Sequence, residues 1–207
     1  MSATLKLARL LEVLRSGEVL AAQVASQQSQ LAPVAWMSRA LRSQATQERS
    51  HATMAAMALA LVGSKVLVPD VTAALHKRIT HDLDSGNLAA SMLGLQGVVE
   101  HLGEALLESL GGYAHPAGAL LHALRVKVLA QERGHVLLGQ RCLQALSAET
   151  RAADTLCIRD EYRAIGRTTA IQVATLLDDA RLDASAFWVK VDCRLCDWHT
   201  RADATLP

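Results

Sequence analysis

The chain has 207 residues, of which 51% are hydrophobic and 20% are charged, and its formal net charge is +1. This length suits one domain with a sizeable core. Positive and negative side chains nearly balance and no basic block stands out, so nucleic acid is not an expected partner. Alanine and leucine are abundant whereas glycine, proline and aromatic residues are few, which favours helices over strands. We therefore predict an all-α fold.

The sequence also predicts where the protein resides. Lys6, Arg9 and Glu12 interrupt the N-terminal segment, so it lacks the apolar region of a secretory signal. The most apolar stretch, residues 54–68, contains Gly63 and Lys65 and is too short to cross a bilayer. We expect a cytoplasmic protein that does not bind membranes. The high apolar fraction leaves room for a buried interface, so we expect a homo-oligomer, a dimer.

Helical periodicity runs through the first half of the chain, and turn residues divide it. A first helix is predicted over residues 3–28. A second helix should begin at Pro33, which suits a first helical position, and end near Val62, where Gly63 follows. A shorter connecting helix is expected from Asp70, a candidate N-cap, to about residue 82.

The second half repeats the long helices. After a turn at residues 84–87, a third long helix is predicted to reach Leu110, before Gly111 and Gly112. A fourth should run from beyond Pro116 to Leu146, and a fifth, over residues 152–181, should pack outside the other four. Two helical hairpins joined by a long crossover are a common bundle arrangement. We predict one helical bundle domain, 1–184, followed by a C-terminal tail, 185–207.

The tail contains the motif Cys193-x-x-Cys196-x-x-His199. These residues could bind zinc or iron or cycle as a dithiol, but a rubredoxin or zinc-ribbon site needs a second cysteine pair. The chain has four cysteines in all, and the other two fall within helical patterns. We therefore expect an ordinary tail, with the metal or redox role as the alternative.

The second and fourth helices share a chemical motif. Each contains Gln-Glu-Arg-x-His, at residues 47–51 and again at residues 131–135. Glutamate and histidine three residues apart lie on one face of a helix, and together they suit iron or manganese. One Glu-x-x-His can arise by chance, but two in the second arm of two hairpins indicate a duplicated hairpin with a metal site.

A duplicated site predicts one further glutamate on the first arm of each hairpin. Glu18 lies about 11 residues before its turn and Glu100 about 11 before Gly111, so each reaches the depth of its partner motif at 1.5 Å of rise per residue. Glu104 and Glu108 continue the same row, so Glu104 is the alternative to Glu100. We favour Glu100 and expect Glu104 and Glu108 to form a solvated stripe. Apolar residues surround these positions, and a carboxylate in such a core must be protonated or ligated.

This pattern resembles the ferritin-like diiron-carboxylate superfamily, in which two helices each give one Glu and two others each give Glu-x-x-His. The resemblance covers roughly residues 5–146. Together with the helix pattern, it implies a ferritin-like four-helix bundle with a crossover helix; the additional C-terminal helix departs from a plain ferritin. The resemblance also implies two iron ions, with manganese or mixed metals as alternatives, in which Glu48 and Glu132 bridge, Glu18 and His51 complete one site, and Glu100 and His135 complete the other.

The long segment between the two hairpins is similar to that of oxygenase-type members such as aldehyde-deformylating oxygenases. The resemblance thus implies an enzyme, a dinuclear-iron oxidoreductase that activates dioxygen to oxidise a small or lipid-like organic substrate and takes electrons from a donor. The alternatives are a ferritin-like iron-binding or ferroxidase protein, and a non-catalytic helical protein with a vestigial site. Gly94, Gly97 and Gly103 on the third helix indicate either a substrate channel or close helix packing.

Overall fold

The computed structural model describes residues 2–63, 68, 70–111, 118–146 and 155–204. Throughout these residues the regular structure is helical, as predicted. The elements are α1 (Ala3–Leu31), α2 (Ala35–Val62), α3 (Ala73–Asp84), α4 (Leu88–Gly94), the π-helical segment η1 (Leu95–Val99), α5 (Glu100–Leu110), α6 (Gly118–Ala145), α8 (Thr155–Asp179) and α9 (Ala184–Ala204).

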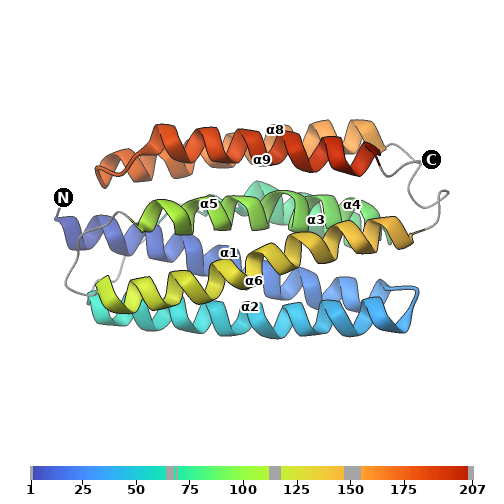
Figure 1. Ribbon diagram of the computed structural model, residues 1–207, viewed down its shortest axis with the longest axis horizontal. Coiled ribbons are helices and arrows are strands. Elements are labelled where there is room, and N and C mark those ends of the chain that lie inside the picture. Colours follow the sequence, from blue (N-terminus) through green and yellow to red (C-terminus); the bar gives the residue numbers. More distant parts are fainter. Residues whose placement is uncertain (1, 64–67, 69, 112–117, 147–154, 205–207) are drawn as a thin grey trace.

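Four long helical rods form the bundle (Figure 1). Helices α1 and α2 pack along each other as the first hairpin, while α4, η1 and α5 follow one another as a single rod that pairs with α6 in the second. The hairpins meet where α2 contacts α6 and where α1 contacts α4, η1 and α5. The connecting helix α3 lies against α1, α4 and α8. This is the predicted four-helix bundle with a crossover helix.

A further pair of helices, α8 and α9, covers one side of the bundle (Figure 1). Helix α8 contacts α1, α3 and α4, and α9 contacts η1 and α5. Helix α8 is the additional C-terminal helix that we predicted. The expectation of a tail after residue 184 is wrong for Ala184–Ala204, which form α9. Apolar side chains recur on one face of α9 and are buried, namely Phe187, Val191, Leu195 and Trp198.

Local capping explains several helix ends. The Ser2 side chain accepts a hydrogen bond from the Leu5 N–H at the start of α1. Helix α2 ends as predicted at Gly63, whose φ of 72° is the left-handed conformation that glycine adopts easily. Asp70 is not the N-cap of α3, because Thr72 holds that position. Asp70 instead accepts hydrogen bonds from the backbone N–H and the hydroxyl of Thr72.

The third rod contains a π-helical turn that the sequence analysis did not predict. Segment η1 precedes Glu100 directly, and all five of its residues are buried. A π turn accommodates one extra residue in a helix and often lies beside a functional site. Here it lies in the rod that carries Glu100 toward the bundle interior. No helix within the described part of the chain is long and apolar enough to cross a membrane.

Candidate metal centre

The structure brings the six predicted ligands together in the middle of the bundle. Each of the four rods contributes, and every one of the six residues is at most 6% exposed. The contributing residues are Glu18 on α1, Glu48 and His51 on α2, Glu100 on α5, and Glu132 and His135 on α6. Helical spacing explains the pairs, because residues three apart on α2 and on α6 lie on the same face.

The six residues form two overlapping groups. One group is Glu18, Glu48, His51 and Glu132, and the other is Glu48, Glu100, Glu132 and His135. Within each group, one nitrogen or oxygen atom from every residue lies within 4.8 Å of those from the others. Glu48 and Glu132 belong to both groups. The arrangement is therefore that of two adjacent four-residue sites that share two carboxylates.

Each shared carboxylate directs one oxygen toward each histidine. Glu48 Oε1 lies 2.7 Å from His135 Nδ1, and Glu48 Oε2 lies 3.0 Å from His51 Nδ1. In the same way, Glu132 Oε1 lies 3.3 Å from His51 Nδ1, and Glu132 Oε2 lies 3.7 Å from His135 Nδ1. A carboxylate that reaches both sites in this manner could bridge two cations.

The unshared glutamates each approach one histidine. Glu18 Oε2 lies 3.2 Å from His51 Nδ1, and Glu100 Oε2 lies 3.5 Å from His135 Nδ1. Both histidines therefore direct Nδ1 to the carboxylates. The two rings lie side by side, with centroids 6.2 Å apart.

Burial and mutual repulsion shape the electrostatics of the four carboxyl groups. Burial, together with repulsion from Glu132, raises the pKa of Glu18 and of Glu100 well above the usual value. The pKa of Glu48 and that of Glu132 are lowered, because hydrogen bonds outweigh burial. Burial opposes charging of His51, but the hydrogen bonds to Glu132, Glu18 and Glu48 raise its pKa to about 12. Protons therefore balance much of the charge of this cluster.

Two buried atoms of the centre have no hydrogen-bond partner among the described residues. They are Glu132 Oε1 and His135 Nδ1, each an atom with a lone pair available in the unprotonated group. Charged groups lie nearby, with Glu48 Oε1 2.7 Å from His135 Nδ1 and His51 Nδ1 3.3 Å from Glu132 Oε1, but neither contact has the geometry of a hydrogen bond to these two atoms, and a buried polar atom without one is costly. Carboxylate oxygens and imidazole nitrogens are ligands that divalent iron and manganese accept. The two atoms without a hydrogen bond and the donor set thus fit a pair of divalent cations.

A row of buried glutamines continues from the centre through the core, and the sequence analysis missed it. Gln44 Nε2 donates to Glu100 Oε1 at 2.6 Å and to Glu48 Oε1 at 3.2 Å. Gln96 Nε2 in turn donates to Gln44 Oε1 and to Gln28 Oε1. Gln44 stands one helical turn before Glu48 on the inward face of α2, and this spacing was the available signal.

Glu104 lies outside both groups, as the preference for Glu100 requires. Its carboxylate pairs with Arg133 at 3.3 Å and with Arg194 at 3.5 Å. Glu108 pairs with Lys190 at 2.9 Å and with Arg194 at 2.8 Å. The expected solvated stripe is therefore wrong, because α9 covers these two glutamates and supplies Lys190 and Arg194 as positive partners, beside Arg133 of α6.

The glycines of the third rod serve two different purposes. An added Cβ at Gly94 would lie 2.5 Å from side-chain atoms of Ile79 and Tyr162, and one at Gly97 would lie 2.3 Å from Trp198 Nε1. These two glycines allow close helix packing. A Cβ at Gly103 would meet nothing within 4 Å, because Gly103 lines a cavity.

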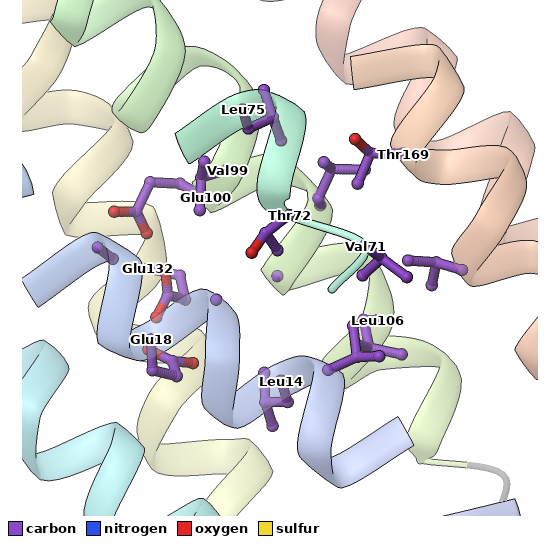
Figure 2. A pocket seen from close by; sticks show the side chains of 16 residues that line it. Leu14, Glu18, Val71, Thr72, Leu75, Val99, Glu100, Leu106, Glu132 and Thr169 are labelled. Atoms are coloured by element: carbon purple, nitrogen blue, oxygen red, sulfur yellow. The ribbon is translucent and has the colours of Figure 1, made fainter. Parts of the chain in front are cut away.

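This cavity has a volume of about 50 Å³ and adjoins the carboxylates. Figure 2 shows Glu18, Glu100 and Glu132 gathered at one side and Leu14 and Leu106 at the other. The lining comes from α1, the segment before α3, α3 itself, the third rod, α6 and α8, and most of it is aliphatic. At ~10–15 Å³ per water molecule, the space holds roughly four waters.

The two cysteines of the C-terminal motif take no part in the centre. Cys193 is exposed and Cys196 is half-buried; both lie on α9 and neither forms a disulfide. Neither belongs to a metal-binding group found among the described residues. The side chain of His199 lies outside the described residues.

Comparison with known proteins identifies the fold of this chain. No family model matches the chain, and no curated protein sequence matches it significantly. Among solved structures, a protein with aldehyde deformylating oxidase activity from Synechococcus is similar, with a TM-score of 0.79 and 16% sequence identity. The similarity covers 99% of this chain and 91% of that one. The chain therefore has the ferritin-like helical fold, and its predicted resemblance to the ferritin-like diiron-carboxylate superfamily is confirmed at the level of the fold.

Proposed function

We propose that the centre binds two iron ions and that the protein is an oxidoreductase that activates dioxygen to oxidise an organic substrate. One observation carries this proposal. Four glutamates and two histidines are buried together and form two groups that share Glu48 and Glu132. The similarity in fold to the Synechococcus protein with aldehyde deformylating oxidase activity supports the same kind of chemistry.

The geometry suggests a role for each residue. Glu48 and Glu132, with one oxygen toward each histidine, would bridge the ions. Glu18 and His51 would complete one ion's protein ligands. Glu100 and His135 would complete the other's. When bound, the ions would supply the reduction of dioxygen and the oxidation of the substrate, with electrons from a separate donor.

The cavity indicates the kind of substrate. Its walls are mainly Val, Leu and Ala side chains, and its carboxylates lie at one side. An apolar chain would be bound by burial of its surface, with its reactive end beside the glutamates. The aliphatic walls would also exclude water from that end. A small or lipid-like organic molecule is therefore the substrate class that we propose, and a cavity of this chemistry favours organic oxidation over iron storage.

The ligand set favours iron or manganese over softer metals. All four carboxylates are hard oxygen donors, and the two imidazoles are of intermediate softness. No cysteine thiolate belongs to either group of the described residues. Iron is the choice we propose because the proposed activation of dioxygen needs a redox-active metal, with manganese or a mixed pair as the alternatives.

The test is iron-dependent oxygen consumption with a reductant and a series of aliphatic aldehydes and alcohols. Turnover by the iron-loaded protein should fall to background in Glu48→Ala and His135→Ala, because each removes a ligand. Glu104→Ala is the matched control, since Glu104 lies one turn from Glu100 and pairs with arginines instead. Turnover that survives both ligand variants would refute the proposal. Oxidation of iron alone, with no organic product, would favour a ferroxidase.

A further inference from the structure

The first residue of each Gln-Glu-Arg-x-His motif contacts the histidine of the other motif. His51 Nε2 on α2 lies 2.7 Å from Gln131 Oε1 on α6, and His135 Nε2 on α6 lies 2.7 Å from Gln47 Oε1 on α2. Gln47 stands four residues before His51 on its own helix, yet its amide oxygen meets His135. The two contacts are therefore reciprocal and cross from one hairpin to the other.

These contacts determine which nitrogen of each histidine carries a hydrogen. An amide oxygen can only accept, so the ring nitrogen that faces it must donate. In the neutral form of each ring, Nε2 of His51 and of His135 thus carries the hydrogen, and the lone pair on Nδ1 faces the carboxylates. A metal-binding histidine needs this arrangement, because the bond made by one nitrogen orients the other.

The choice of glutamine has an electrostatic consequence. Four carboxylates with two divalent cations sum to a neutral cluster, and a neutral amide leaves that sum unchanged. A carboxylate at the same position would add one negative charge to a site that is nearly closed to water. The amide thus orients the ring at no cost in buried charge.

We propose that Gln47 and Gln131 are positioning residues that act crosswise: Gln47 orients His135, and Gln131 orients His51. The proposal rests on the metal centre proposed above, since it assigns both histidines to metal binding through Nδ1. It also explains why the glutamine is part of both motifs. Each hairpin supplies ligands to the centre and, in addition, the hydrogen-bond acceptor that orients the other hairpin's histidine.

The first experiment detects the hydrogen bonds in the metal-free protein by NMR of ¹⁵N-labelled histidine. The variant is Gln47→Met, which keeps the length of the side chain and removes the acceptor. The Nε2–H signal of His135 should shift and exchange faster with water, while that of His51 stays in place. Gln131→Met should do the converse. An effect of Gln47→Met on His51 instead of His135 would indicate a contact within one helix and would overturn the proposal.

The second experiment measures zinc binding by titration calorimetry, with zinc as a redox-inert probe. Loss of such an orienting contact weakens metal binding by about 10–100-fold, and we expect this of Gln47→Met and of Gln131→Met. Gln47→Glu retains an acceptor and should bind zinc more tightly than Gln47→Met, although its added negative charge should keep the affinity below that of wild type. Gln140→Met is the matched control, because Gln140 is also a partly buried glutamine of α6 and lies outside the motif.

The two experiments separate the failure of this proposal from the failure of the metal centre. Wild-type protein that binds no zinc and no iron would contradict the metal centre, and the NMR experiment would still decide the crosswise contacts. Normal zinc affinity in both methionine variants would overturn the positioning role. Affinity in Gln47→Glu as low as in Gln47→Met would overturn it as well, provided that circular dichroism shows both variants folded.

Discussion

Glu48 Oε1 on α2 lies 2.7 Å from His135 Nδ1 on α6, so a carboxylate of the first hairpin belongs to the site completed by the second. Removal of a shared ligand should therefore lower the number of bound metal ions more than removal of an unshared ligand. Glu48→Ala removes an oxygen donor from both groups, whereas Glu18→Ala removes one from a single group. We expect wild type to bind about two iron ions per chain, Glu18→Ala about one, and Glu48→Ala fewer than one.

Elemental analysis of protein loaded with iron(II) under anaerobic conditions measures this stoichiometry. Glu104→Ala should bind as much iron as wild type, since Glu104 pairs with Arg133 and Arg194 and not with the centre. Equal iron content in Glu18→Ala and Glu48→Ala would contradict the sharing of Glu48.

The stabilisation that metal confers should increase with pH. The pKa of His51 is raised to about 12 in the folded metal-free protein, so its proton stabilises the fold fully below pH 6.5, and this contribution declines as the pH rises toward 12. A metal ion has to displace that proton, together with those that the raised pKa values of Glu18 and Glu100 retain. Metal binding therefore becomes stronger at higher pH, while the metal-free fold loses the contribution of His51.

Urea denaturation at pH values of about 6, 7.5 and 9, with and without zinc at a buffered free concentration, checks this pH dependence. The difference in unfolding free energy between the two forms should widen at each step. Glu18→Gln, which has no proton to displace, should show a shallower rise. A difference that is constant over this range would contradict proton displacement at the centre.

Helix α9 should contribute strongly to stability through Trp198. This side chain is 2% exposed, and it lies against Gly97 and Gly139 and beside the ring of His101. Trp198→Ala should lower the free energy of unfolding by about 3–5 kcal/mol, the usual cost for a buried tryptophan, as measured by urea denaturation. Loss of less than about 1 kcal/mol would mean that α9 does not pack on the bundle as described.

Two glycines on the third rod give a matched pair of substitutions. Gly97→Ala places a methyl group 2.3 Å from Trp198 Nε1, and such overpacking costs about 1–3 kcal/mol. Gly103→Ala meets open space and should gain up to about 1 kcal/mol from helix propensity. The same denaturation measurements distinguish them, and equal effects would contradict the different surroundings of the two glycines.

A larger side chain at Gly103 should fill the cavity beside the carboxylates. Gly103→Leu adds four carbon atoms to a cavity of about 50 Å³, so we expect slower turnover of organic substrates. The iron content should stay at the wild-type level, because Gly103 offers no ligand atom. Product analysis together with elemental analysis tests this expectation. Unchanged turnover of long-chain substrates in an iron-loaded Gly103→Leu protein would show that they enter elsewhere.

Local signals explain why much of the fold could be predicted. The left-handed turn at Gly63, the break at residues 84–87 and the long periodic segments are properties of neighbouring residues, and the structure has them all. The two Glu-x-x-His pairs are local too, because helix geometry alone sets their spacing. Helix α9 was missed because the cysteine motif, rather than its buried apolar face, guided the interpretation of residues 185–207.

The sequence by itself determined the helices, the hairpin repeat and the six residues that meet in the centre. Only the tertiary structure decided which helices face each other, and hence that Gln47 meets His135 rather than His51 and that Glu104 meets Arg194. The π turn at Leu95–Val99 also depends on packing, because its buried residues fit between helices that are distant in sequence. The physical reason is that propensity and periodicity act within one helix, whereas partners across helices follow from the relative rotation and depth of whole rods.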